Sequence, residues 1–125
     1  MKKTILIIED DPALLVILVD KFRQEGFDIL TANNGQGGLN VALQQHPDII
    51  LLDIIMPVLD GMTTLATLRK SDWGKNVPVM ILTNLSDAKK QEEAACLDVH
   101  DYLVKSDVTM NNLVQKIKER LGIPL

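Results

Sequence analysis

Five polar side chains stand at the ends of short apolar runs in this sequence, and together they could hold a metal ion and a phosphoryl group. Glu9 and Asp10 follow the first run, Asp53 follows the third, Thr83 ends the fourth, and Lys105 follows the fifth. Converging carboxylates repel one another unless a cation joins them, and hard oxygen ligands suit Mg²⁺. A hydroxyl and an ammonium group could share the oxygens of a phosphoryl group with that ion. One of the carboxylates could therefore be a nucleophile toward phosphorus.

Asp53 follows four consecutive apolar residues, at positions 49–52, that predict a central strand. The run is too short for a helix, and its continuous apolar character indicates burial on both faces of a sheet. Ligands of open α/β sheets collect outside the carboxyl ends of the strands. Pro57 and the pair Asp60-Gly61 then indicate a loop, because proline cannot extend a strand ladder and Asp-Gly favours a tight turn. Asp53 is therefore expected at a strand tip beside a shaped loop.

Apolar and amphipathic stretches alternate five times along the chain, a pattern typical of a β-α repeat with a parallel sheet. The expected strands cover residues 4–8, 27–32, 49–52, 77–82 and 102–104. The expected helices cover residues 12–25, 35–45, 62–70, 88–97 and 110–121. The polar residues at the strand ends would then meet at one edge of the sheet, because parallel strands all end on the same side.

Helix ends can be predicted from capping residues. Asp11 is the expected N-cap of the first helix, with Pro12 at its first position and Gly26 closing it. Gly37 and Gly38 each destabilise the second helix by about 1 kcal/mol relative to alanine, so its start is expected to be frayed or mobile. The N-caps expected for the last two helices are Ser86 or Asp87, and Thr109.

Composition restricts the class of protein. A length of 125 residues with 46% apolar residues suits one domain over residues 1–125. The net charge of −4 argues against direct binding of nucleic acid by this chain, since such proteins usually carry a basic surface. Cys96 is the only cysteine, which favours a reducing compartment such as the cytoplasm. The apolar run at residues 5–8 is too short for a signal peptide or a membrane span.

Five short motifs make the sequence similar to the receiver domain of two-component response regulators over essentially its whole length. They are Ile-Leu-Ile-Ile-Glu9-Asp10-Asp11, Leu-Leu-Asp53-Ile-Ile-Met-Pro57, Asp60-Gly61, Ile-Leu-Thr83-Asn and Asp101-Tyr102-Leu-Val-Lys105. Each motif is weak alone, but all five in order are specific. The resemblance implies a flavodoxin-like α/β fold: a doubly wound, five-stranded parallel sheet in the order 2-1-3-4-5, with helices on both faces.

The resemblance also implies a role for each matched residue of the site. Asp53 would accept a phosphoryl group from a histidine kinase or a histidine phosphotransfer protein. Asp10 and Asp53 would bind Mg²⁺ directly with the backbone carbonyl of Ile55, and Glu9 would act through water. Lys105 would neutralise charge on the phosphoryl group.

Thr83 and Tyr102 would form the switch that responds to phosphorylation. The expected protein is a signalling switch that catalyses only its own phosphorylation and dephosphorylation, and its output protein or domain stays open. One alternative is a receiver-like interaction module without phosphorylation, against which the complete set of acids, threonine and lysine argues. Another is a phosphatase of the haloacid dehalogenase type, but that family needs a second acid where this chain has Ile55.

Three positions depart from the family pattern. Ser106 replaces the proline that usually follows Lys105 in a cis bond, and because a cis bond before a non-proline residue costs about 2.5 to 4 kcal/mol, a trans bond is expected. Asp98-Val99 replaces a common Gly-Ala, so Asp98 must adopt the left-handed conformation or the chain must avoid it. The resemblance allows a homodimer to form on phosphorylation. Glu93, however, stands where transcription factors of this family often carry an arginine that makes salt bridges across the dimer, which argues against that form of dimer.

Ile55 and Leu85 occupy the positions two residues beyond Asp53 and Thr83, which border the path of hydrolytic water in the family. Neither side chain can hold a water molecule by a hydrogen bond, and both are bulky. Slow intrinsic dephosphorylation is therefore expected.

Overall fold

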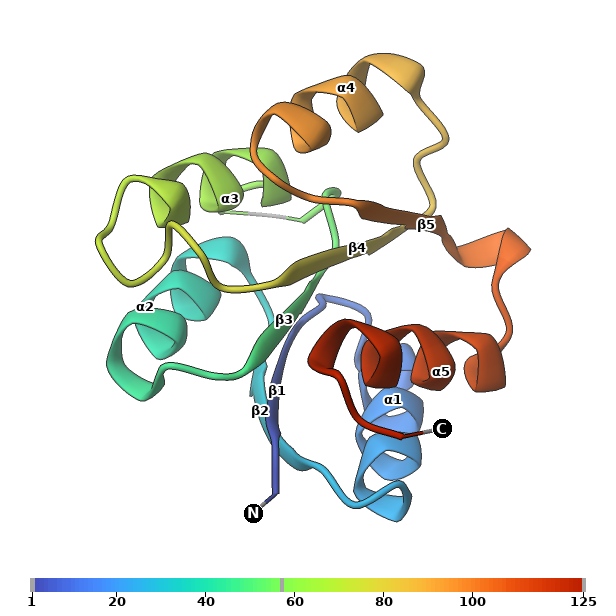
Figure 1. Cartoon of the computed structure of the whole chain (residues 1–125). Coiled ribbons are helices and arrows are strands. Elements are labelled where there is room, and N and C mark those ends of the chain that lie inside the picture. Colours follow the sequence, from blue (N-terminus) through green and yellow to red (C-terminus); the bar gives the residue numbers. More distant parts are fainter. Residues whose placement is uncertain (1, 57, 125) are drawn as a thin grey trace.

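The computed structural model of the chain describes residues 2–56 and 58–124, which form one parallel sheet covered by helices on both faces (Figure 1). The strands are β1 (Thr4–Ile8), β2 (Asp28–Ala32), β3 (Ile49–Leu52), β4 (Val79–Thr83) and β5 (Asp101–Val104). The helices are α1 (Pro12–Gln24), α2 (Gly35–Gln45), α3 (Gly61–Arg69), α4 (Ala88–Cys96) and α5 (Met110–Leu121). The strand order is β2-β1-β3-β4-β5, so the predicted fold is confirmed.

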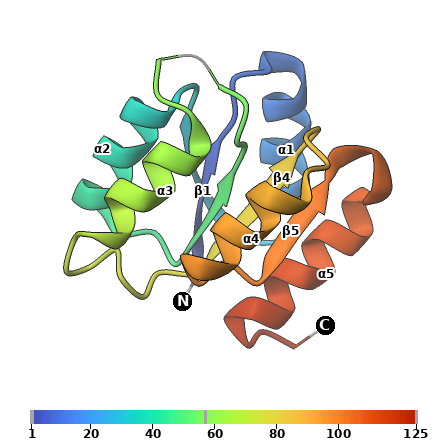
Figure 2. The same ribbon diagram turned by 90° about the horizontal axis from the view of Figure 1, so that it is seen from above.

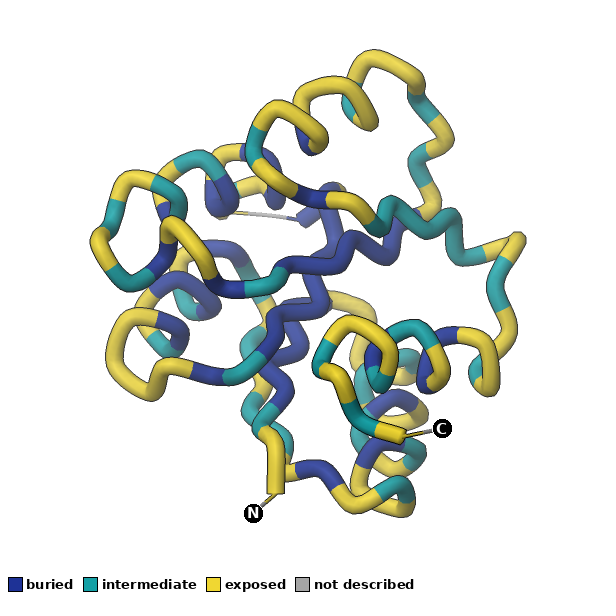
Figure 3. Tube along the Cα trace, viewed as in Figure 1, coloured by how far each residue is buried: buried dark blue, intermediate teal, exposed yellow. Residues whose placement is uncertain are grey.

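Two hydrophobic clusters lie on opposite faces of the sheet, because successive side chains of a strand point to opposite sides. Ile50 and Leu52 of β3 belong to the cluster under α2, α3 and α4. Ile49 and Leu51 belong to the cluster under α1 and α5. Figure 1 shows the two groups of helices on separate sides of the sheet, and Figure 2 shows α2 and α3 on the side away from α1 and α5. All four residues of β3 are at most 3% exposed, so the predicted central strand is confirmed, and Figure 3 shows it within the buried interior.

Caps fix the helix starts, and some boundaries differ from the expected ones. Asp11 accepts hydrogen bonds from the backbone amides of Ala13 and Leu14, as predicted for the N-cap of α1. Asp60 caps α3, which therefore begins at Gly61 rather than at residue 62. Asp87 and not Ser86 caps α4.

Two strands begin later than expected. β4 begins at Val79 rather than at residue 77, because Pro78 has no amide hydrogen to donate to the ladder. β2 begins at Asp28 rather than at Phe27, whose amide instead donates to the carbonyl of Phe22 in a turn after α1.

Gly38 has a packing reason in α2. A Cβ atom at this position would overlap the side chain of Ile8, so glycine lets α2 approach β1 closely. The helix is continuous from Gly35 to Gln45, and its predicted mobility stays a prediction. None of the helices in the described part of the chain has the length and apolar character needed to span a membrane.

Candidate functional site

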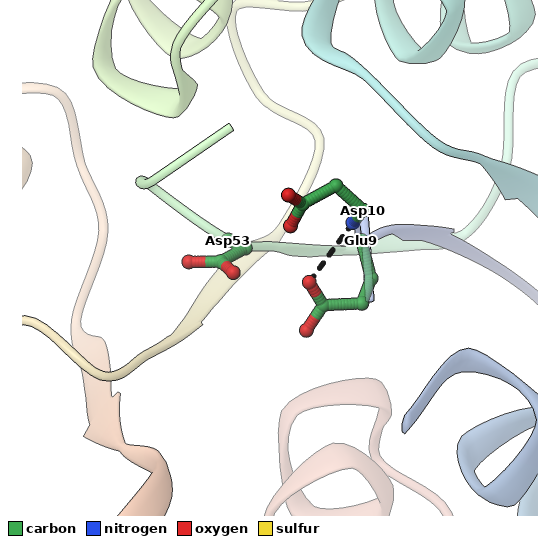
Figure 4. A group of neighbouring side chains, drawn as sticks. All are labelled: Glu9, Asp10 and Asp53. Carbon is green, nitrogen blue, oxygen red and sulfur yellow. Dashed lines mark hydrogen bonds between the residues drawn. The ribbon is translucent and has the colours of Figure 1, made fainter. Parts of the chain in front are cut away.

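Three carboxylates gather at the carboxyl edge of the sheet because β1 and β3 are parallel neighbours. Ile8 is paired with Leu52 in the ladder, so the residues that follow the two strands emerge side by side. Oxygen atoms of Glu9, Asp10 and Asp53 all lie within 4.8 Å of one another, and Figure 4 shows the three side chains converging. Glu9 is 2% exposed and Asp53 is 5% exposed, whereas Asp10 is open to solvent.

Both oxygens of the Asp53 carboxylate have partners that hold it in place. Oδ1 accepts a hydrogen bond from the backbone amide of Ile55 at 3.2 Å. Oδ2 accepts one from Nζ of Lys105 at 3.0 Å. The amide of Asp53 itself donates to the carbonyl of Ile8 at 3.1 Å, which ties this residue to β1. The acid that the sequence singled out is therefore buried, oriented and in contact with a cation.

Glu9 is held from two sides. Its Oε2 atom accepts hydrogen bonds from the amides of Asp10 at 2.9 Å and Asp11 at 3.3 Å. Its Oε1 atom lies 2.6 Å from Nζ of Lys105 as an ion pair, without the alignment of a hydrogen bond. Burial raises the pKa of Glu9 to about 7; Lys105 opposes this increase and the charge of Asp53 adds to it.

Lys105 reaches both buried acids from the end of β5, across the tip of β4. Burial alone would lower the pKa of its ammonium group, but contacts with Glu9 and Asp53 raise that pKa overall. One lysine cannot neutralise three carboxylates, so the cluster keeps an excess of negative charge. A small, hard divalent cation with oxygen ligands, such as Mg²⁺, would remove that excess, and the residues present fit this ion.

Thr83 and Tyr102, the expected switch residues, meet at the segment that follows β4. Thr83 is fully buried, and its Oγ1 atom accepts a hydrogen bond from the amide of Leu85 at 3.3 Å. The hydroxyl of Tyr102 donates to the carbonyl of Leu85 at 2.6 Å. Burial raises the pKa of the Tyr102 phenol, and the charges of Asp87 and Asp53 act in the same direction. Both side chains thus bind one residue of the loop before α4.

A cavity of about 220 Å³ adjoins Asp53. It is lined by Asp10, Asp11, Asp53, Ile55, Asn84 and Lys105. Leu85, the other residue expected beside the path of the water, is not among the residues that line this cavity, and its side chain packs against the hydrophobic cluster under α2, α3 and α4. Asn84 was not among the predicted site residues, although it directly follows Thr83 at the end of a strand, and that position was a usable signal.

The structure resolves two of the three departures. None of the described residues forms a cis peptide bond, so the bond between Lys105 and Ser106 is trans as predicted, and Lys105 still contacts Asp53. Asp98 itself adopts the left-handed conformation, with φ of 61°. An oxygen of the Glu93 carboxylate lies 3.6 Å from Nζ of Lys90 in the same helix. The predicted loop residue Pro57 lies outside the described residues.

Comparisons with known proteins agree with this geometry. The family model of the response regulator receiver domain matches residues 5–118. Transcriptional regulatory protein PrrA of Mycobacterium tuberculosis is 37% identical over 117 residues, which cover 94% of this chain and 49% of PrrA. The DNA-binding dual master transcriptional regulator RpaA of Synechocystis is 35% identical over 101 residues, covering 81% of this chain and 42% of RpaA.

A solved structure adds a comparison of the site. The receiver domain of a sensor histidine kinase from Pseudomonas aeruginosa, determined with a magnesium ion coordinated in its active site cleft, is 26% identical. It superposes with a TM-score of 0.87, covering 98% of this chain and 99% of that one. This chain belongs to the family of response regulator receiver domains.

Proposed function

We propose that this chain is a phosphoryl-accepting switch of a two-component phosphorelay and that Asp53 is the acceptor. The observation that carries the proposal is the contact between buried Asp53 and Lys105 at 3.0 Å, beside Glu9 and Asp10 at the same edge of the sheet. A structural ion pair would need only one acid. Two further carboxylates beside it are explained by a metal ion and a phosphoryl group that share the site.

The donor would be a phosphohistidine of a histidine kinase or a histidine phosphotransfer protein. A carboxylate oxygen of Asp53 attacks phosphorus, so that an oxygen–phosphorus bond forms and the nitrogen–phosphorus bond breaks. The electron pair of the broken bond stays on the departing imidazole of the donor. Lys105 lies close enough to Asp53 to neutralise charge on the transferred group.

The proposed metal ligands are Asp10, Asp53 and the carbonyl of Ile55, with Glu9 acting through water. Bound Mg²⁺ would supply positive charge to the carboxylates and to the phosphoryl oxygens. In this structure the backbone amide of Ile55 donates a hydrogen bond to one oxygen of the Asp53 carboxylate and holds it in place. Because Glu9 binds two backbone amides of its own loop, it keeps that loop in a fixed position beside Asp53.

Thr83 and Tyr102 would transmit the effect of phosphorylation at Asp53 to the surface of the protein. A phosphoryl oxygen on Asp53 can attract the Thr83 hydroxyl, which would weaken its contact with the amide of Leu85. The bond between Tyr102 and the carbonyl of Leu85 would then respond, and with it the loop before α4. This coupling converts a local charge into a change at the surface.

Partners of the whole protein are part of the proposal. The chain spans 49% of PrrA and 42% of RpaA, so these relatives contain further sequence outside the matched region. We propose that residues 1–125 form one receiver domain that does not bind nucleic acid itself. It would act on an output domain or a separate output protein, and a homodimer formed on phosphorylation is compatible with this role.

Intact mass measurement after incubation with acetyl phosphate and Mg²⁺ tests the proposal. The parent chain should gain one phosphoryl group, Asp53→Asn should gain none, and the exposed control Asp72→Asn should behave like the parent. Steady release of phosphate from assorted monoesters would instead indicate a phosphatase. Absence of any adduct would leave the interaction module as the better description.

A further inference from the structure

Asn84 lines the cavity beside Asp53, and it is the only uncharged polar side chain among the described residues that do so. It follows Thr83 at the tip of β4 and is exposed to solvent. A carboxamide can both donate and accept hydrogen bonds at any pH near neutrality. Asn84 could therefore hold a water molecule at the mouth of this cavity.

The other lining residues are poorly suited to that task. Lys105 is bound to Glu9 and Asp53, and the Asp11 carboxylate caps α1 by accepting from Ala13. The Ile55 side chain, 54% exposed, has no hydrogen-bonding group.

Asp10 and Asp53 are the proposed metal ligands and carry negative charge, as does a phosphoryl group. Asn84 is not a proposed metal ligand, and its carboxamide takes part in none of the side-chain hydrogen bonds among the described residues.

We infer that Asn84 positions the water that hydrolyses phosphorylated Asp53, an inference that rests on the proposed function. The water oxygen bonds to phosphorus on the side opposite Asp53, and the bond between phosphorus and the Asp53 oxygen breaks. Its electron pair returns to the carboxylate, inorganic phosphate leaves, and the released proton passes to solvent. The carboxamide of Asn84 accepts a hydrogen bond from the water and aligns it.

Ile55 forms an apolar part of the same wall, so it cannot replace Asn84. Removal of the carboxamide should therefore slow hydrolysis, although it widens the cavity. A residue that merely blocked the entrance would act in the opposite direction, because its truncation would admit water. The sign of the change in lifetime thus separates the two roles.

The test compares the parent chain with Asn84→Ala, Asn84→Gln and the control Asn111→Ala, an exposed residue of α5. Each is phosphorylated with acetyl phosphate in Mg²⁺, the donor is removed, and the loss of the adduct is followed by intact mass. Asn84→Ala should lengthen the lifetime about threefold to tenfold, the effect of one hydrogen bond. Asn84→Gln should restore part of the hydrolysis, and Asn111→Ala should match the parent.

An equal or shorter lifetime for Asn84→Ala would overturn the inference while leaving Asp53 as the acceptor. A slowed phosphorylation with no effect on decay would also overturn it, since Asn84 would then act on transfer and not on the water. Failure of the parent itself to form an adduct would overturn the proposed function and this inference together.

Discussion

Glu9 is a buried carboxyl group whose protonation depends strongly on its surroundings. Its pKa is raised to about 7 from the ordinary 4.5, first by burial and then by the charge of Asp53, against the effect of Lys105. Between these two pH values the folded chain binds a proton that the unfolded chain has lost. The free energy of unfolding should therefore fall as pH rises through this window.

Glu9→Gln should flatten this part of the stability profile, because the amide cannot titrate. Urea unfolding of the metal-free protein at several pH values between 4.5 and 7 measures the effect. The matched control is Glu92→Gln, an exposed residue of α4, which should keep the slope of the parent. Parallel profiles for the parent and Glu9→Gln would contradict the assignment of the raised pKa to Glu9.

Ile55 lines the cavity without any group that can hold water, so a polar side chain there should speed the loss of the phosphoryl group. Ile55→Asn should shorten the lifetime of the adduct severalfold without preventing phosphorylation, since only the backbone of Ile55 is a proposed metal ligand. Decay measured after removal of the donor tests this. Val58→Asn, a change of another exposed apolar residue of the same loop, serves as the control, and an effect as large there would contradict the idea.

Sequence reasoning identified the residues at strand tips because parallel strands end at one edge, whatever the details of their packing. It could not show which way the side chain of Leu85 points, two residues beyond a strand. The amide of Leu85 binds the Thr83 hydroxyl, and the resulting turn directs Leu85 toward the hydrophobic cluster and leaves Asn84 at the cavity. Such a turn depends on one side-chain hydrogen bond, which periodicity does not encode.

Helix α4 ends in a Schellman arrangement made by Asp98. The amide of Asp98 donates to the carbonyl of Ala95, and the amide of Val99 donates to that of Ala94. Asp98 has φ of 61°, where a side chain is strained and glycine is not. The end of α4 thus keeps its geometry despite the missing glycine.

Asp98→Gly should raise the free energy of unfolding by roughly 0.5 to 1 kcal/mol, because it removes this strain. Asp98→Ala should lower it. The charge of Asp98 also acts on Arg69, so Asp98→Asn serves as the control that removes the charge and keeps tolerance for this conformation. Urea unfolding measures all three, and a glycine variant less stable than the asparagine variant would contradict the account.

The elements themselves were largely predictable, since apolar runs, caps and glycines mark them. Where two signals were equivalent the sequence left a choice, as between Ser86 and Asp87 for the cap of α4, and the structure shows Asp87 in that place. From the sequence alone, Gly37 and Gly38 of α2 indicate only a loss of helix stability. Contact between Gly38 and Ile8 compensates for that loss, and it depends on the packing of α2 against β1.

The fold as a whole places its acids, lysine and threonine from four strands at one edge, and helices on both faces keep those strands in register. No local segment could make the site alone, since Asp53 and Lys105 lie 52 residues apart in sequence and are in contact. We therefore propose that this assembly carries a phosphoryl group on Asp53.

Chemical mapping of the phosphoryl acceptor tests this role of Asp53 most directly. The chain is treated with acetyl phosphate and Mg²⁺, reduced with borohydride, which converts an aspartyl phosphate to homoserine, and then digested and sequenced by mass spectrometry. The account predicts homoserine at position 53 and at no other acid, and none when Mg²⁺ is chelated beforehand. Homoserine at position 10 in place of position 53 would contradict the proposed acceptor. Peptides that still contain an unmodified Asp53 after stoichiometric phosphorylation of the chain would also contradict it.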